Sequence, residues 1–168
     1  MPRVFVSIGS NQDRERSVRT AVSALERRFR DVRLSSVYET EAVGFEGDPF
    51  FNLVAGFETE LDLEEVVRAL RDIETLVGRV RTGKRFGPRT MDIDVLTYGD
   101  AVCDQDPVEV PRGEITRHAY VLHPLAELAP EATHPVLGES FSSLDRRLGL
   151  DRHGMRRVAF SPRGPEAA

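Results

Sequence analysis

The apolar residues of this chain follow two periods, one typical of strands and one typical of helices. Short apolar runs between polar or glycine-containing clusters predict four strands, at residues 3–8, 32–40, 51–60 and 92–98. Apolar positions three or four residues apart predict two amphipathic helices, at residues 13–29 and 62–77. Asp62 and Glu65 have the spacing of a capping box at the start of the second helix, and Gly78 is a suitable stop.

The order of these elements is β-α-β-β-α-β, which is typical of a ferredoxin-like α+β core with an antiparallel sheet. Two later segments, residues 116–129 and 141–148, predict additional helices. The composition turns polar from about residue 151 onward. We therefore expect a single domain over residues 1–160 and a polar C-terminal tail over residues 161–168.

Residues 79–100 combine a cationic loop with a strand that carries two carboxylates. The cationic residues are Arg79, Arg81, Lys84, Arg85 and Arg89. Because residues two apart in a strand point to the same face, Asp92 and Asp94 present their carboxylates side by side, while Ile93 and Val95 turn toward a core. Mg²⁺ commonly binds one or two carboxylates plus substrate phosphates, and arginine forks hold phosphate oxygens. The combination favours a metal-bound phosphate ligand over the simpler alternative of a solvated charged surface.

Composition narrows the class of ligand and the location of the protein. The 168 residues are 40% hydrophobic and 30% charged, with one cysteine and a net charge of −5. We expect a soluble, cytoplasmic protein that does not bind membrane, because there is no membrane-length apolar run and no N-terminal leader. We also expect a monomer that does not bind nucleic acid. The single Cys103 excludes an intrachain disulfide. A basic cluster on an acidic chain favours a small phosphorylated substrate over DNA or RNA.

Residues 78–84 match the spacing of a phosphate-binding Walker A loop, but two observations argue against that assignment. The next residue is Arg85, not the serine or threonine that would hold Mg²⁺. The segment also follows a predicted helix and leads into a strand, which is the reverse of the order that such a loop requires.

Residues 85–96, with the sequence RFGPRTMDIDVL, resemble the signature of the 6-hydroxymethyl-7,8-dihydropterin pyrophosphokinase family. The resemblance extends from about Val4 to about Pro135 and includes the segments IGSN at 8–11, FFN at 50–52 and GRVR at 78–81. It implies the same ferredoxin-like core, with helices on both faces of the sheet in a three-layer sandwich.

The family resemblance also implies an activity and a set of site residues. The activity is transfer of the β,γ-pyrophosphoryl group of ATP to the hydroxymethyl group of a reduced pterin in folate biosynthesis, with release of AMP. The resemblance implies that Asp92 and Asp94 hold two Mg²⁺ ions and that Arg79, Arg81 and Arg89 grip the phosphates as catalytic residues. The implied ATP-binding residues are Glu74, Arg81, Arg89, Val95, Arg112 and Arg117. The implied pterin-binding residues are Thr40, Val43, Phe50, Asn52, Phe86 and Tyr120.

Some positions depart from the family pattern or allow a second interpretation. Arg112 replaces an expected phosphate-contacting histidine, His118 stands where an arginine belongs, and Phe86 replaces a common tryptophan. The alternative for Glu74 is an exposed helix carboxylate, and the alternative for Phe50 is a core residue.

Two other function classes remain as alternatives. The departures on the ATP side motivate a family relative that holds nucleotide or pterin without turning it over. An RNA-binding ferredoxin-like domain is the third interpretation, although the chain lacks a suitable strand aromatic pair and is acidic.

Overall fold

The computed structural model describes residues 1–41, 47–82, 91–105 and 108–164, with the backbone alone for residues 80–82. The strands are β1 (Arg3–Ser10), β2 (Arg30–Leu34), β3 (Val37–Thr40), β4 (Phe50–Glu58), β5 (Asp92–Tyr98), β6 (Cys103–Gln105), β7 (Val108–Val110) and β8 (Arg156–Val158). The helices are α1 (Arg14–Arg28), α2 (Leu63–Thr82), the 3-10 helix η1 (Gly113–Thr116), α3 (Ala119–Leu128) and α4 (Phe141–Leu148).

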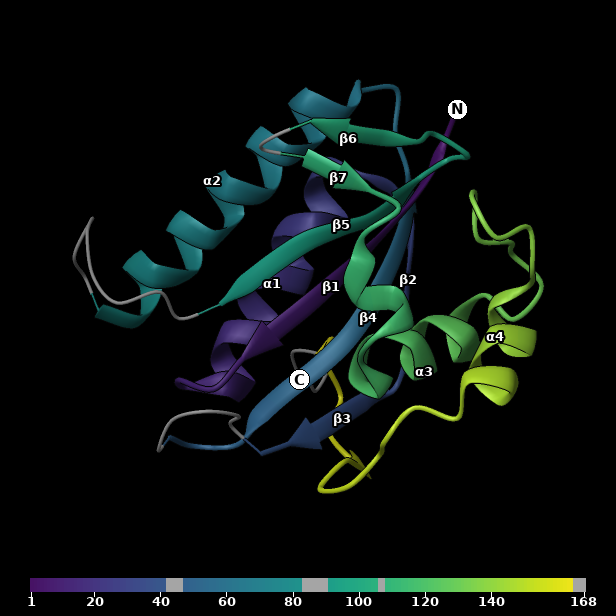
Figure 1. The fold of residues 1–168 in the computed structure, drawn as a ribbon. Coiled ribbons are helices and arrows are strands. Elements are labelled where there is room, and N and C mark those ends of the chain that lie inside the picture. Colours follow the sequence, from purple (N-terminus) through teal and green to yellow (C-terminus); the bar gives the residue numbers. More distant parts are fainter. Residues whose placement is uncertain (42–46, 83–90, 106–107, 165–168) are drawn as a thin grey trace.

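A six-stranded sheet in the order β5-β1-β4-β3-β8, with β2 also paired to β4, forms the middle layer (Figure 1). All of its strand pairs are antiparallel. Strand β1 lies between β4 and β5, and it pairs with β4 from Arg3 to Ser10 and with β5 from Val4 to Gly9. This register brings the last residues of β1 beside the first residues of β4 and β5, and that end of the sheet carries the site described below.

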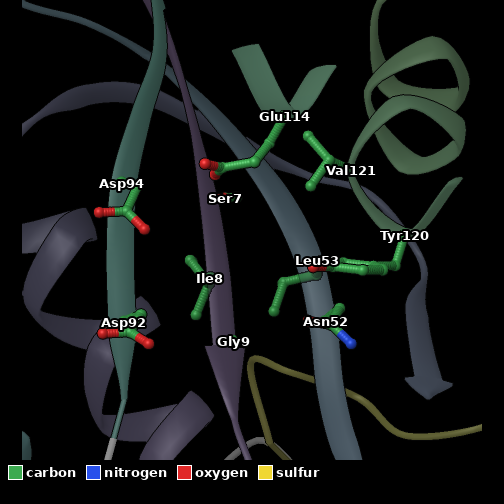
Figure 2. A pocket seen from close by; sticks show the side chains of 10 residues that line it. All are labelled: Ser7, Ile8, Gly9, Asn52, Leu53, Asp92, Asp94, Glu114, Tyr120 and Val121. Carbon is green, nitrogen blue, oxygen red and sulfur yellow. The ribbon is translucent and has the colours of Figure 1, made fainter. Parts of the chain in front are cut away.

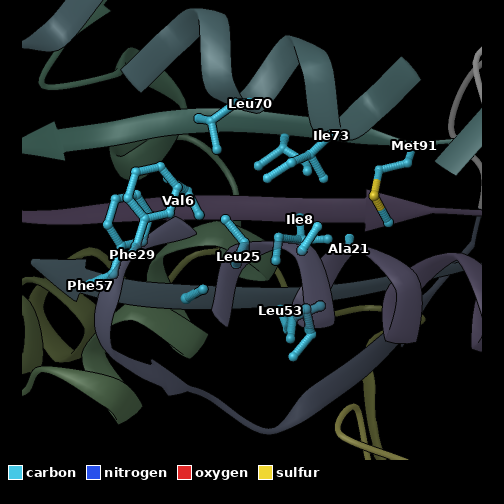
Figure 3. Packing of buried hydrophobic residues seen from close by; sticks show 14 of the residues in the cluster. Val6, Ile8, Ala21, Leu25, Phe29, Leu53, Phe57, Leu70, Ile73 and Met91 are labelled. Carbon is cyan, nitrogen blue, oxygen red and sulfur yellow. The ribbon is translucent and has the colours of Figure 1, made fainter. Parts of the chain in front are cut away.

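Helices α1 and α2 cover one face of the sheet and bury the larger of two apolar clusters (Figure 3). Leu25, Leu70 and Ile73 on these helices are at most 1% exposed. At one end of this layer Phe29 stacks on Phe57, with ring centroids 4.0 Å apart. Apolar burial of this kind is the main favourable term in folding.

Helices α3 and α4 cover the opposite face, so the molecule has three layers (Figure 1). Val54 and Leu96 point from the sheet into this second cluster, which also holds Leu122, Phe141 and Leu144. The predicted ferredoxin-like order, the antiparallel sheet and the helices on both faces are therefore confirmed. Among the described residues no helix has both the length and the apolarity that a membrane crossing needs.

Several predicted boundaries are confirmed because the local signals are strong. Strand β5 and helix α4 begin and end at the predicted residues. The capping box is also present: the backbone N–H of Glu65 donates to Asp62 Oδ1 at 2.8 Å, and the backbone N–H of Asp62 donates to Glu65 Oε1 at 3.1 Å. Gly149 ends α4 with a positive φ of 51°, where glycine carries no steric penalty.

Other boundaries were predicted wrongly. The predicted strand over residues 32–40 is broken into β2 and β3 at Ser35 and Ser36. The backbone N–H of Ser35 still donates to the carbonyl of Val54, but the backbone N–H of Val54 donates to the Ser35 hydroxyl in return. Ser36 donates to the carboxylate of Glu127 on α3, so side-chain bonds interrupt the backbone pairing there. Gly78 does not stop α2, which continues to Thr82.

The chain after α4 returns to the sheet, which the sequence did not indicate. Strand β8 pairs with β3, and Phe160 then stacks on Phe51 of β4 with ring centroids 5.0 Å apart. The guanidinium of Arg19 lies 4.6 Å from the centroid of the Phe160 ring. Beyond Phe160, Arg163 donates to the backbone carbonyl of Val32 at 2.9 Å, so residues of the segment predicted as a tail contact the domain.

Replacing Phe160 with alanine is expected to lower the free energy of unfolding by about 2 kcal/mol, from the lost aromatic stack and cation–π contact. Urea unfolding followed by circular dichroism measures this loss. Val136→Ala is the control, because Val136 is 61% exposed and its truncation should change stability by less than about 0.5 kcal/mol. A Phe160→Ala change as small as that of the control would show that the C-terminal segment does not stabilise the domain.

Candidate active site

A cleft of about 190 Å³ opens at the end of the sheet where β1, β4 and β5 meet the start of α3 (Figure 2). Its described lining residues are Ser7, Ile8, Gly9, Asn52, Leu53, Asp92, Asp94, Glu114, Tyr120 and Val121. The cleft therefore combines carboxylates on one side with an amide and an aromatic ring on the other.

The acidic side of the cleft is built by strand alternation along β5. Asp92 is exposed and Asp94 is partly exposed, while Ile93 and Val95 are buried in the α1–α2 cluster. The prediction that the two carboxylates share a face is thus confirmed (Figure 2). Asp92 lies opposite Gly9 on β1, which has no side chain to fill the cleft beside that carboxylate.

Two arginines flank the carboxylate of Asp94. Arg71 on α2 places Nη2 3.3 Å from Asp94 Oδ1, and Arg112 places Nη2 3.7 Å from Oδ2. Arg112 is also held by an ion pair with Glu114 and by its backbone N–H, which donates to the carbonyl of Leu96 at 2.9 Å. Burial opposes the charge of Arg112, but the hydrogen bond to Glu114 and the charge of Asp94 outweigh it and raise the Arg112 pKa above its ordinary value.

Glu74 is held between α2 and β5 and is not the exposed helix carboxylate of the simpler alternative. Its side chain is 10% exposed. Oε2 accepts from the backbone N–H of Ile93 at 2.7 Å, and Oε1 accepts from Arg71 at 2.6 Å. These bonds fix α2 against the strand that carries Asp92 and Asp94.

The other side of the cleft suits a flat, polar ligand. Asn52 is 8% exposed, and its amide Nδ2 donates to Thr40 Oγ1 at 2.7 Å, which fixes the orientation of the amide beside the cleft. The Tyr120 ring lies across the cleft from the carboxylates of Asp92 and Asp94 (Figure 2). It stacks on the His118 ring, with ring centroids 5.0 Å apart. Burial and the charge of Glu114 raise the pKa of the Tyr120 hydroxyl, so the ring stays neutral.

The two phenylalanines at the start of β4 face opposite ways, which decides between the two interpretations of Phe50. Phe51 is 5% exposed and lies in the α1–α2 cluster, under the guanidinium of Arg14 and against Phe160. Phe50 is only partly buried, and strand alternation places it on the same side as Asn52. Phe50 is therefore outside the buried core, and it is not among the described residues that line the cleft.

Of the remaining predicted site residues, some lie within the described part of the chain and some do not. Val43, Phe86 and Arg89 lie outside the described residues, as does the side chain of Arg81. Arg79 is exposed on the last turns of α2.

Besides Glu74 and Arg112, two further predicted ATP-binding residues have side chains whose surroundings the structure describes. The side chain of Val95 packs in the α1–α2 core, so it turns away from the cleft. Arg117 lies against Gly113, where a Cβ would come within 2.7 Å of its guanidinium.

Sequence reasoning missed Arg71, Glu114 and Gly9. Glu114 lines the cleft, and Arg71 lies beside Asp94 although 23 residues separate the two in sequence. The available signals were local: Arg71 precedes Glu74 by three residues on one helix, and Glu114 follows Arg112 by two. Neither spacing indicates that both arginines meet the same carboxylate.

The residues of the cleft fit a hard divalent cation that shares its coordination with a ligand. Asp92 and Asp94 offer carboxylate oxygens on one face of β5, and the cleft leaves space beside them. Within the described ranges no group of three or more histidine, cysteine, aspartate or glutamate side chains could form an all-protein metal cage. This donor set matches Mg²⁺, which commonly takes one or two carboxylates and completes its shell with phosphates and water.

Comparison with known proteins connects this α+β fold and its acidic cleft with one family. Residues 5–130 match the sequence profile of 7,8-dihydro-6-hydroxymethylpterin-pyrophosphokinase (HPPK). A 2-amino-4-hydroxy-6-hydroxymethyldihydropteridine pyrophosphokinase of Pseudomonas aeruginosa is 39% identical over 137 residues, covering 79% of this chain and 84% of the relative. The enzyme of the same name from Aquifex aeolicus is 34% identical over 138 residues, covering 81% and 86%.

A solved structure supports the fold. The crystal structure of wild-type HPPK-DHPS of Plasmodium falciparum superposes with a TM-score of 0.70 at 15% identity, covering 94% of this chain and 48% of that one. This chain thus spans about half of that two-part protein. The chain belongs to the 7,8-dihydro-6-hydroxymethylpterin-pyrophosphokinase family.

Proposed function

We propose that this protein transfers the pyrophosphoryl group of ATP to 6-hydroxymethyl-7,8-dihydropterin, giving AMP and the pterin diphosphate, in folate biosynthesis. The observation that carries the proposal is the pairing, within one cleft, of Asp92 and Asp94 with Asn52 and Tyr120. The first pair suits a metal-bound polyphosphate, and the second suits a planar heterocycle with hydrogen-bonding edges. Family membership supports the same reaction.

In this reaction the hydroxymethyl oxygen of the pterin forms a bond to the β-phosphorus of ATP. The bond from that phosphorus to the α,β-bridging oxygen breaks, AMP leaves with the bridging oxygen, and the hydroxyl proton passes to solvent. Phosphoryl-transfer enzymes act mainly by positioning the reactants and stabilising charge. The Thr40-held amide of Asn52 and the Tyr120 ring orient the pterin, and Asp92 and Asp94 face the polyphosphate.

We propose Mg²⁺ dependence, with two ions held by Asp92 and Asp94. When bound, Mg²⁺ neutralises the polyphosphate and lowers the pKa of a nearby hydroxyl. Arg79, Arg81 and Arg89 are proposed to contact the phosphates, with Arg112 and Arg117 as further contacts on the ATP side. For the whole protein we propose a cytoplasmic monomer that acts on small molecules and binds neither nucleic acid nor membrane.

The binding module that does not turn over its ligand was motivated by the departures at Arg112 and His118. Arg112 reaches Asp94 at the cleft and therefore supplies a cation where the family has a phosphate-contacting histidine. His118 stacks on Tyr120 and so supports the aromatic side of the cleft. Both positions thus have a role that is compatible with catalysis.

Release of AMP from ATP and Mg²⁺, measured with and without 6-hydroxymethyl-7,8-dihydropterin, tests the proposed function. AMP and the pterin diphosphate should form in equal amounts, and only when the pterin is present. Tight binding of both substrates without any AMP release would favour the binding module instead.

A further inference from the structure

The carboxylate of Asp94 has a guanidinium beside each of its oxygens. Arg71 Nη2 lies 3.3 Å from Oδ1, and Arg112 Nη2 lies 3.7 Å from Oδ2. The two arginines come from different parts of the fold, one from α2 and the other from the segment that follows β7. Their charges compensate Asp94 before any cation binds, and a cation that approaches this carboxylate meets two positive charges.

Each arginine is anchored more closely to another group than to Asp94. Arg71 donates to Glu74 Oε1 at 2.6 Å and to the carbonyl of Ile93 at 2.8 Å. Arg112 is held by the short contact to Glu114, a carboxylate that also lines the cleft (Figure 2). The contacts to Asp94 are the longest of the set, so they are the ones that a ligand breaks most easily, while the anchors keep both guanidiniums at the cleft.

We infer that Arg71 and Arg112 are the resident counter-charges of Asp94 and exchange partners when substrate binds: the divalent cation takes Asp94, and the two guanidiniums turn to oxygens of the polyphosphate. Glu74 and Glu114 act as positioning residues that hold the arginines within reach of either partner. This inference rests on the proposed function for the identity of the polyphosphate as ATP.

The exchange makes cation and nucleotide binding cooperative. A cation alone displaces the guanidiniums from Asp94 and leaves each with only its anchoring carboxylate, Glu74 or Glu114, and no second anion in place of Asp94. A nucleotide alone must compete with Asp94 for the same guanidiniums. Together each ligand releases the group that the other needs, so each should strengthen the binding of the other by the same factor.

Mn²⁺ binding to the purified protein, followed by the electron paramagnetic resonance signal of the free ion, tests the inference without turnover. The titration is run alone and with an ATP analogue that has a methylene group in place of the α,β-bridging oxygen. For the wild-type protein, Mn²⁺ should bind weakly alone and much more tightly with the analogue. Arg112→Ala and Arg71→Gln should each tighten Mn²⁺ binding without the analogue by about threefold, the size expected for one partly exposed ion pair. Both variants should weaken analogue binding in the presence of Mn²⁺ by about tenfold or more.

Arg68→Ala is the matched control, because Arg68 is an exposed arginine one turn before Arg71 on the same helix and lines a different groove. It removes the same charge from α2 and should leave Mn²⁺ affinity within about 1.5-fold of wild type. Arg112→Lys should keep most of the cooperativity, since it retains a positive charge.

The inference is overturned if Arg112→Ala and Arg71→Gln change Mn²⁺ affinity no more than Arg68→Ala does. It is also overturned if they weaken Mn²⁺ binding without the analogue, since the arginines would then orient Asp94 for the cation. If the protein released no AMP in the pyrophosphokinase assay, the proposed function would be contradicted. The Mn²⁺ titration could still be interpreted, because it contains no pterin and follows binding alone.

Discussion

Replacing Asp92 or Asp94 with asparagine is expected to lower turnover by about 100-fold or more while the fold stays intact. Each change removes one carboxylate charge from the face of β5 that lines the cleft. Removing a single charge-stabilising group from an active site typically costs about 10²-fold or more in rate. Initial rates of AMP release at saturating ATP, Mg²⁺ and pterin measure the effect.

The fold should tolerate both substitutions for reasons that the structure supplies. Asp92 is exposed, and the ion pairs of Asp94 join partly exposed side chains, a class of pair that contributes about 1 kcal/mol or less. Asp104→Asn is the control, because Asp104 is an exposed carboxylate on β6 outside the cleft. An Asp92→Asn or Asp94→Asn enzyme that keeps more than about a tenth of wild-type turnover would contradict the assignment of these residues to the metals.

Replacing Asn52 with leucine is expected to lower kcat/KM for the pterin by roughly 10- to 100-fold and to leave ATP affinity almost unchanged. Leucine has the same branched arrangement of side-chain heavy atoms but offers neither a donor nor an acceptor to a heterocycle. Loss of a buried hydrogen bond costs about 1–3 kcal/mol when it leaves the polar partner unsatisfied. Steady-state kinetics with each substrate varied in turn separates the two affinities.

Thr40→Val gives a graded version of the same experiment. It removes the hydroxyl that accepts from Asn52 Nδ2 at 2.7 Å but leaves the amide in place. The amide then loses its fixed orientation, and KM for the pterin should rise by only a few-fold. If Asn52→Leu weakens ATP and pterin equally, Asn52 supports the shape of the cleft and the pterin is bound elsewhere.

The structure gives a physical reason for the departure from the family pattern at Arg112. The guanidinium of Arg112 is always charged and presents several hydrogen-bond donors in one plane. A histidine at this position would carry a charge only near or below its pKa of about 6.5. Its position between Asp94 and Glu114 shows how such a permanent cation is accommodated: two carboxylates stabilise it. Asp94 is the carboxylate with which a nucleotide competes in the proposed exchange, and Glu114 holds Arg112 in place.

The sequence by itself determined the order of the core elements and the acidic half of the site, and the family resemblance implied the helices on both faces of the sheet. Alternation from Asp92 to Tyr98 predicted both the limits of β5 and the common face of its two aspartates. The capping box at Asp62 and Glu65 was also readable, as was α4, which ends at Gly149. These features depend on residues a few positions apart, so a period or a short motif contains the information.

Only the tertiary structure decided which distant groups meet at the cleft. Arg71, Asp94 and Arg112 lie on three separate segments, and no local spacing relates them. The pairing of β8 with β3 and the contact of Phe160 with Phe51 were equally invisible, because a strand of three residues has too short a pattern to predict its partner. The break of the predicted strand at Ser35 and Ser36 depends on Glu127 of α3. In each case the deciding interaction joins residues that are far apart in the chain and close together only after the sheet and its two helical layers have packed.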